Sequence, residues 1–238
     1  MSQALICVGP SDLPIVSCLN EPGIYLWDRG VLKSVVRDTD LQLGTSETFL
    51  GAPVLNDAGQ IAFVASGVIP DVDGVYLYNG NEPSGSQLKR IAATGEATPS
   101  GDTFFHQLSL SSVATIERNR PALNEAGQVA FIASLIDASS NDRGLGIYVY
   151  DAQQGLTQVV QTGDSLLGGR VDSLDFWRHE FVSGTDRRGI NDLGQVAFQF
   201  LLDDGRNGIA VWTVPEPNTW PLAIAGILAL VLIAFRRS

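Results

Sequence analysis

The chain has few of the residues from which catalytic and metal sites are commonly built. Its 238 residues include two cysteines, two histidines and one methionine. Cys7, Cys18, His106 and His179 do not have the spacing of a zinc cluster or of a cysteine–histidine catalytic pair. The sequence therefore argues against both kinds of site.

Basic residues are also scarce. Lysine and arginine number 15 against 26 aspartates and glutamates, which gives a formal net charge of -11. A surface that follows a nucleic-acid backbone needs clustered positive charge. We therefore expect no nucleic acid among the partners of this protein.

Turn-forming residues are plentiful, with 25 glycines and 11 prolines. Such a composition favours many chain reversals and few long helices. The hydrophobic fraction of 45% is typical of a folded domain. The sequence predicts an all-β fold for most of the chain.

One apolar run near the C-terminus is the exception to this pattern. Residues 220–235 contain no charged side chain, begin at Trp220 and are followed by Arg236 and Arg237. As a helix the run would be about 24 Å long, and interfacial tryptophan and arginine side chains would extend it toward the roughly 30 Å of a bilayer core. This predicts a transmembrane helix. The two arginines favour the cytoplasmic side, which places residues 1–214 on the opposite side.

A proline-rich motif, Val214-Pro215-Glu216-Pro217, stands just before this run. The motif, the apolar run and the basic end, with Arg236 and Arg237, together resemble the PEP-CTERM sorting signal of Gram-negative bacteria. The resemblance implies recognition by the membrane enzyme exosortase, transient anchoring in the inner membrane and removal of the tail. It further implies that the mature protein reaches the cell surface or extracellular matrix.

The first residues do not match the export that this signal implies. Residues 1–22 have no early lysine or arginine, and Pro10 and Pro14 interrupt their apolar run, so no signal peptide is recognised. We therefore expect that the N-terminus is truncated. In an exported protein Cys7 and Cys18 either form a disulfide or stay as two thiols.

The body of the chain contains three copies of the pattern Asn-x-x-Gly-Gln-(Ile/Val)-Ala-Phe. Their defining residues are Asn56, Gly59 and Phe63, then Asn124, Gly127 and Phe131, then Asn191, Gly194 and Phe198. We expect the asparagine side chain to cap a tight turn, the glycine to take a positive φ angle and a strand to follow.

Two further patterns accompany these copies. A segment of the type Gly-Ile-Tyr-Val-Tyr occupies residues 23–27, 74–78, 146–150 and 208–212, and a third strand is expected at 32–36, 88–92 and 156–160. Alternation puts isoleucine and valine on one face and the tyrosines on the other. Residues 104–113 are expected to supply a fourth strand.

The repeats resemble those of the choice-of-anchor proteins with tandem NxxGxxAF repeats, over residues 23–214. The resemblance implies a bacterial surface location and a repeat architecture, with no reaction assigned. We expect repeated antiparallel four-stranded units that are propeller-like, but about thirteen strands make hardly more than three blades. An open stack of sheets and a compact β-sandwich remain alternatives. The predicted layout is an N-terminal segment 1–22, a repeat domain 23–214 and a sorting segment 215–238.

Two loops are candidate ligand sites. Residues 71–82 have the length of a calcium loop, but hydrophobic residues of a predicted strand occupy ligand positions, so no cofactor is expected and weak calcium binding is only an alternative. Residues 172–179 mix aromatic and polar side chains in the manner of a sugar-binding loop, with Asp175, Trp177 and His179 as its candidate ligand residues.

The predicted function is that of an exported scaffold without enzymatic activity, with structural, adhesive or exopolysaccharide-associated interactions. No serine nucleophile elbow or phosphate loop is present in the sequence. The alternative is an extracellular propeller-type hydrolase or lyase that acts on polysaccharide, with acidic loop residues and His179 as catalytic groups.

Overall fold

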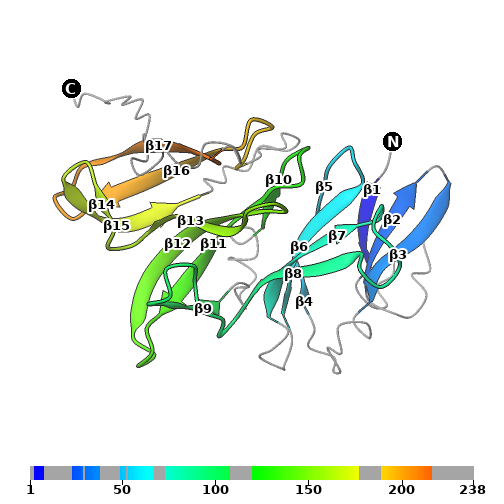
Figure 1. Ribbon diagram of the computed structural model, residues 1–238, viewed down its shortest axis with the longest axis horizontal. Coiled ribbons are helices and arrows are strands. Elements are labelled where there is room, and N and C mark those ends of the chain that lie inside the picture. Colours follow the sequence, from blue (N-terminus) through cyan, green and yellow to red (C-terminus); the bar gives the residue numbers. More distant parts are fainter. Residues whose placement is uncertain are drawn as a thin grey trace. The chain divides into compact units, whose positions relative to one another are not determined.

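The computed structural model describes residues 3–7, 23–28, 30–37, 49–51, 53–66, 73–107, 120–176 and 189–215 (Figure 1). These residues form seventeen strands and no helix. Neighbouring strands within the β1–β3, β4–β8, β10–β13 and β14–β17 sets are paired antiparallel. The predicted all-β class is confirmed for this part of the chain.

The strands form four sheets, which we number along the chain. The first sheet has the order β1 (Gln3–Cys7), β2 (Gly23–Asp28) and β3 (Val31–Arg37). The second has the order β4 (Phe49–Leu50), β6 (Gln60–Ser66), β7 (Gly74–Asn79) and β8 (Leu88–Ala93), and β5 (Val54–Leu55) also pairs with β6.

The third and fourth sheets repeat this plan. The third has the order β10 (Ala122–Leu123), β11 (Val129–Ile136), β12 (Asp142–Asp151) and β13 (Gly155–Gln161), and β9 (Phe104–Gln107) also pairs with β11. The fourth has the order β14 (Ser165–Leu166), β15 (Gly169–Asp175), β16 (Gln195–Leu202) and β17 (Asn207–Thr213).

Each repeated pattern in the sequence occupies the same place in its sheet. The strands that follow the Asn-x-x-Gly turns are β6, β11 and β16, and the Gly-Ile-Tyr-Val-Tyr segments are β2, β7, β12 and β17. Of the fourth strand expected at 104–113, the described part is β9, which ends at Gln107. Strand β1 pairs with β2, so the first sheet begins before residue 23, where the repeat domain was expected to start.

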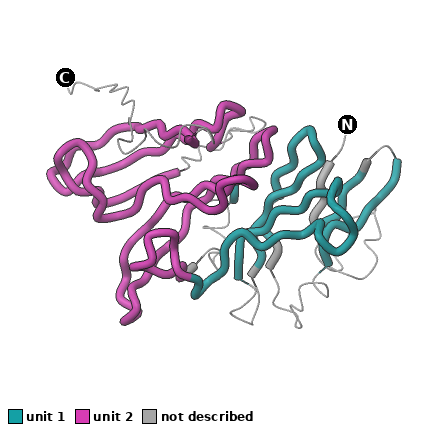
Figure 2. The backbone as a smooth tube through the Cα atoms, viewed as in Figure 1, with its two compact units in different colours: residues 1–96, 107–121 teal, residues 97–106, 122–238 magenta. Residues whose placement is uncertain are grey.

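The chain divides into two compact units (Figure 2). Unit 1 comprises residues 1–96 and 107–121, and unit 2 comprises residues 97–106 and 122–238. Unit 1 contains the first two sheets, and unit 2 contains the other two apart from the last residue of β9. The region predicted as one repeat domain therefore contains two units.

Sheets stack face to face inside unit 1. We call the side of a sheet that holds the tyrosine positions of the Gly-Ile-Tyr-Val-Tyr segment its aromatic face, and the opposite side its aliphatic face. The aliphatic face of the first sheet packs on the aromatic face of the second. The buried side chains of this cluster are Ile24, Leu26 and Val36 from the first sheet with Ile61, Phe63, Ala65, Tyr76 and Tyr78 from the second.

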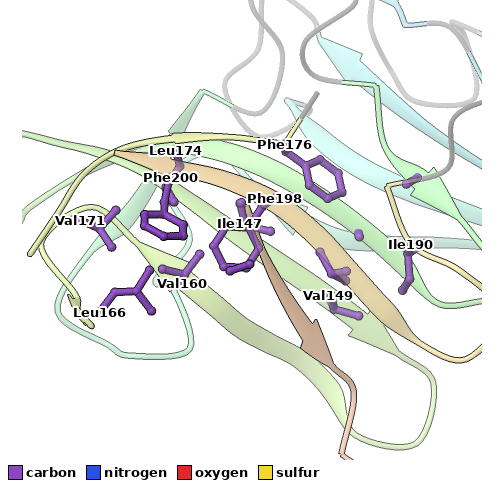
Figure 3. Packing of buried hydrophobic residues seen from close by; sticks show 14 of the residues in the cluster. Ile147, Val149, Val160, Leu166, Val171, Leu174, Phe176, Ile190, Phe198 and Phe200 are labelled. Atoms are coloured by element: carbon purple, nitrogen blue, oxygen red, sulfur yellow. The ribbon is translucent and has the colours of Figure 1, made fainter. Parts of the chain in front are cut away.

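Unit 2 contains a second stack with the same polarity. Ile147 and Val149, on the aliphatic face of the third sheet, lie against Phe198 and Phe200, on the aromatic face of the fourth (Figure 3). Val196, Leu202 and Ala210 extend the same cluster, and all of these side chains are buried. In both units, therefore, the aliphatic face of one sheet covers the aromatic face of the next sheet along the chain.

The predicted membrane segment falls outside this description. Among the residues that the structure describes, no helix is long and apolar enough to span a membrane. Residues 220–235 are not among them.

Candidate functional site

The three Asn-x-x-Gly turns are β-hairpin turns held by the same hydrogen bonds. In the first, the Gly59 N–H donates to the Asn56 carbonyl at 3.1 Å and the Gln60 N–H donates to Asn56 Oδ1 at 2.9 Å. Asn56 Nδ2 donates in turn to Gln60 Oε1 at 2.7 Å. Gly59 has a φ of 78°, a left-handed conformation that glycine adopts at no steric cost. The asparagine therefore caps the turn as its pattern predicts.

The other two turns reproduce this geometry, with φ values of 78° at Gly127 and 70° at Gly194. Asn124 and Asn191 make the same pair of side-chain bonds to the glutamines that follow the glycines, Gln128 and Gln195. The glutamine was not singled out in the sequence, although its presence in all three copies is the signal that would have identified it.

Polar contacts also join the second turn to the third inside unit 2. Asn124 Nδ2 donates to the Asn191 carbonyl at 2.9 Å, and the Glu125 N–H donates to Asp192 Oδ1 at 3.0 Å. Asn124 is fully buried, so all of its polar groups need partners within the protein. These bonds fix the relative position of the two hairpins in the stack.

Asn191 stands at the end of this ladder and is exposed. Its Nδ2 donates to Gln195 Oε1 at 2.8 Å. The second amide hydrogen, which in Asn124 binds the following turn, has no acceptor among the described residues. The third turn therefore has a donor left over for a further partner.

The glycine that opens each Gly-Ile-Tyr-Val-Tyr segment makes room for an aromatic ring. A Cβ atom on Gly146 would lie 2.6 Å from the Tyr148 hydroxyl oxygen, and one on Gly74 would lie 3.3 Å from the Tyr76 ring. In the fourth sheet Gly208 is covered by Phe200 instead, at 3.0 Å. The ring therefore lies back over the glycine, and at Gly74 the main-chain carbonyl oxygen of Ala92, 2.6 Å from such a Cβ atom, leaves still less room for a side chain.

Tyr148 belongs to an aromatic cluster with Phe105 and Phe131. Its ring stacks on Phe131 with centroids 5.7 Å apart and meets the edge of Phe105 at 4.9 Å. Burial raises the pKa of Tyr148, and this effect outweighs the opposing one of the neighbouring Thr98 hydroxyl. The phenol therefore stays neutral at physiological pH.

Several acidic residues accept hydrogen bonds within or beside turns. Asp137 accepts hydrogen bonds from Asn141, Ser139 and Arg143, and these bonds, those from Asn141 first, lower the pKa of Asp137 to about 2. Burial acts to raise the pKa of Asp151, but hydrogen bonds, including one from Gln128, outweigh it and the pKa is lowered. Both carboxylates are therefore ionised hydrogen-bond acceptors at neutral pH.

The candidate ligand loop is described only where it begins. Asp175 is the last residue of β15 and is exposed, while Trp177 and His179 lie outside the described residues. His106, at the third position of β9, is exposed as well. The described residues contain no group of three or more histidine, cysteine or acidic residues that could hold a metal ion. The proposed Cys7–Cys18 pair cannot be placed, since Cys18 is not among the described residues either.

The predicted sorting motif begins directly after β17. The Val214 N–H donates to the Gly194 carbonyl at 2.9 Å, and the Pro215 carbonyl accepts a hydrogen bond from Gln154. A Cβ atom on Gly194 would lie 3.2 Å from Val214 Cβ, so this valine packs on the third repeat turn. Glu216, Pro217, Arg236 and Arg237 lie outside the described residues.

Comparison with known proteins gives a family without an assigned activity. No curated protein matches the chain. No solved structure matches it. The model of a family of unknown function, DUF7453, matches residues 16–221. Because this match spans most of the sequence, the chain belongs to the DUF7453 family.

Proposed function

We propose that this protein is exported by a Gram-negative bacterium, processed by exosortase and retained at the cell surface or in the extracellular matrix. The observation that carries the proposal is the order Val214-Pro215-Glu216-Pro217, apolar residues 220–235, Arg236 and Arg237. In this arrangement the tail is a temporary anchor in the inner membrane, and the repeats stand on the non-cytoplasmic side.

The end of the fold supports a removable tail. Strand β17 ends at Thr213, and Val214 and Pro215 are held by hydrogen bonds to Gly194 and Gln154. All seventeen strands therefore lie before the Pro-Glu-Pro element. Removal of residues beyond it would leave every described strand and its hydrogen bonds intact.

The repeats are proposed to be a non-catalytic scaffold built of propeller-like units. Two observations support this: strands β6 to β8, β11 to β13 and β15 to β17 follow one another as neighbours in their sheets, and successive sheets stack face to face inside each unit. The polar residues that recur in the sequence are used in turns. On this view residues 23–214 form the scaffold, which is propeller-like but open, and 215–238 form the sorting segment.

Exopolysaccharide is the partner we propose for the scaffold. The segment 172–179 combines the exposed carboxylate of Asp175 with Trp177 and His179 in the sequence. Aromatic rings that cover the apolar faces of sugars, with acidic groups that bind their hydroxyls, would give retention without cleavage.

Processing can be tested in a Gram-negative host that has an exosortase. The full chain, preceded by a secretory signal peptide, would be compared with a Pro215→Ala/Pro217→Ala variant. A Pro99→Ala variant, altered in an exposed turn, serves as the matched control. The measurements are cell fractionation and the intact mass of the recovered protein.

We expect the original chain and the Pro99→Ala variant at the cell surface with their C-terminal segment removed. The double variant should keep its full mass and remain with the inner membrane. A surface protein that keeps residues 220–238, or a double variant processed as efficiently as the original, would contradict the proposal.

A further inference from the structure

The two sheets at the ends of the described chain each have exposed apolar side chains on one face. In the first sheet Trp27 and Leu32 are paired across β2 and β3 on the aromatic face, and they are 43% and 37% exposed. In the fourth sheet Ile209 is 49% exposed, and on the same aliphatic face Ala197 is exposed and Val211 is half-buried. This face also holds the exposed polar side chains of Gln199 and Asp175, in register with Ile209.

These two faces are of different kinds, and they are the kinds that pack together inside each unit. The exposed face of the fourth sheet holds Ile209 and Val211, the counterparts of Ile147 and Val149, which pack on aromatic side chains in unit 2. The aromatic face of the first sheet holds the exposed Trp27 and, two residues before it, Tyr25, which is buried. One end thus offers the aliphatic partner of the stack and the other end offers the aromatic partner.

We propose that the occupant of each end face is a second copy of this chain, so that the aliphatic face of the fourth sheet in one copy packs on the aromatic face of the first sheet in the next. The contact continues the stacking already present in both units. Because its two surfaces differ, it is a heterologous head-to-tail contact, which leaves one free face at each end of any assembly and extends it. The inference depends only on the stacking of the sheets and holds whether or not the tail is processed.

The side-chain amide of Asn191, in the turn before β16, agrees with this order of stacking. Asn124 donates its second amide hydrogen to the next sheet in the stack, and the corresponding hydrogen of Asn191 has no acceptor among the described residues. A sheet packed on Ile209 would follow the fourth sheet in the stack, as the fourth sheet, whose turn accepts the Asn124 bond, follows the third. Each copy has a net charge of -11, so association should strengthen as added salt screens this repulsion.

The test uses the full chain in a non-ionic detergent, so that all variants have the same tail environment. Sedimentation velocity would compare the original chain with Ile209→Glu, with Trp27→Glu and with an equimolar mixture of the two variants. Leu193→Glu is the matched control: Leu193 is 76% exposed, and its counterpart Ala126 stays exposed although its own sheet is stacked. Circular dichroism would verify that every variant folds.

We expect the original chain and Leu193→Glu to form species larger than dimers as the concentration rises. Each end-face variant alone should be monomeric, because it keeps only one of the two complementary faces. The mixture should form a one-to-one complex and nothing larger, and its formation shows that the unaltered face of each variant is intact.

Three results would overturn the inference. A monomeric original chain, with both end-face variants melting at lower temperature, would mean that the two faces close on each other within one chain. A closed dimer that only one variant abolishes would mean a symmetric contact. A mixture that does not associate, or variants that assemble like the original, would mean that these faces are not the interface.

Discussion

The buried asparagine of the second repeat should contribute much more to stability than the exposed asparagine of the third. Asn124 makes three hydrogen bonds through its side chain, with distances of 2.9 Å from the Gln128 N–H, 2.7 Å to Gln128 Oε1 and 2.9 Å to the Asn191 carbonyl. At a net contribution of about 1 kcal/mol each, Asn124→Ala should lower the free energy of unfolding by about 3 kcal/mol.

Asn191→Ala is the matched control for this substitution. Asn191 also caps its turn: its Oδ1 accepts from the Gln195 N–H at 2.9 Å and from the Leu193 N–H at 3.0 Å, and its Nδ2 donates to Gln195 Oε1 at 2.8 Å. It is exposed, so water can satisfy the groups that lose their partner, and its main-chain carbonyl still accepts from Asn124 after the substitution. We expect a loss of about 1 kcal/mol.

Equilibrium unfolding in urea, followed by circular dichroism, would measure both variants, which lie in the same unit. The expected difference between the two losses of unfolding free energy is about 2 kcal/mol. It measures the effect of burying Asn124 and of its hydrogen bond to the Asn191 carbonyl. Combining Asn124→Ala with Gln128→Ala should cost less than the sum of the two, because both remove the same hydrogen bond from Asn124 Nδ2 to Gln128 Oε1. Equal losses at Asn124 and Asn191 would refute the argument that the ladder and its burial stabilise unit 2.

Three further predictions concern single side chains. Gly146→Ala should destabilise the third sheet by about 1–3 kcal/mol in the same urea assay, because the new methyl group would overlap the buried Tyr148 ring. Gly194→Ala should lower the free energy of unfolding more than Gly59→Ala. Both glycines have a positive φ angle, which costs an alanine about 1–2 kcal/mol. Only at Gly194 would the new Cβ atom also lie within 4 Å of other side chains. Asp137→Asn should lower the melting temperature at neutral pH but not at pH 2. A lowered pKa stabilises the fold above the ordinary aspartate value of 3.8, and this contribution is lost as the pH falls to about 2.

Local features of the fold could be predicted from the sequence because they depend on nearby residues. The positive φ of Gly59 and the cap from Asn56 both lie within a five-residue turn, and the alternation of Ile147 and Tyr148 follows from the pleat of one strand. Strands β5 and β10 have only two residues each, too few for any alternation to appear.

Features that join distant segments could not be predicted in this way. The Asn124 side chain binds the main-chain carbonyl of Asn191, and every residue has such a carbonyl, so the sequence has no signal for the pair. The polarity of stacking also depends on which sheet lies next to which. The alternation of Ile147 and Tyr148 gives two faces but does not say which face meets the next sheet. The ligand loop was predicted from composition at residues 172–179; the structure describes residues 172–176 of it and places residues 172–175 in strand β15.

Incubation of the full-length protein with exopolysaccharide from a bacterium that produces it tests most directly whether this protein is a scaffold. Co-sedimentation would measure binding, while size-exclusion chromatography and an assay of reducing ends would measure the length of the polysaccharide. We expect the protein to retain the polysaccharide and the length of the polysaccharide to stay unchanged. Release of shorter oligosaccharides would contradict the scaffold and favour a hydrolase or lyase, and an absence of binding would contradict the proposed partner.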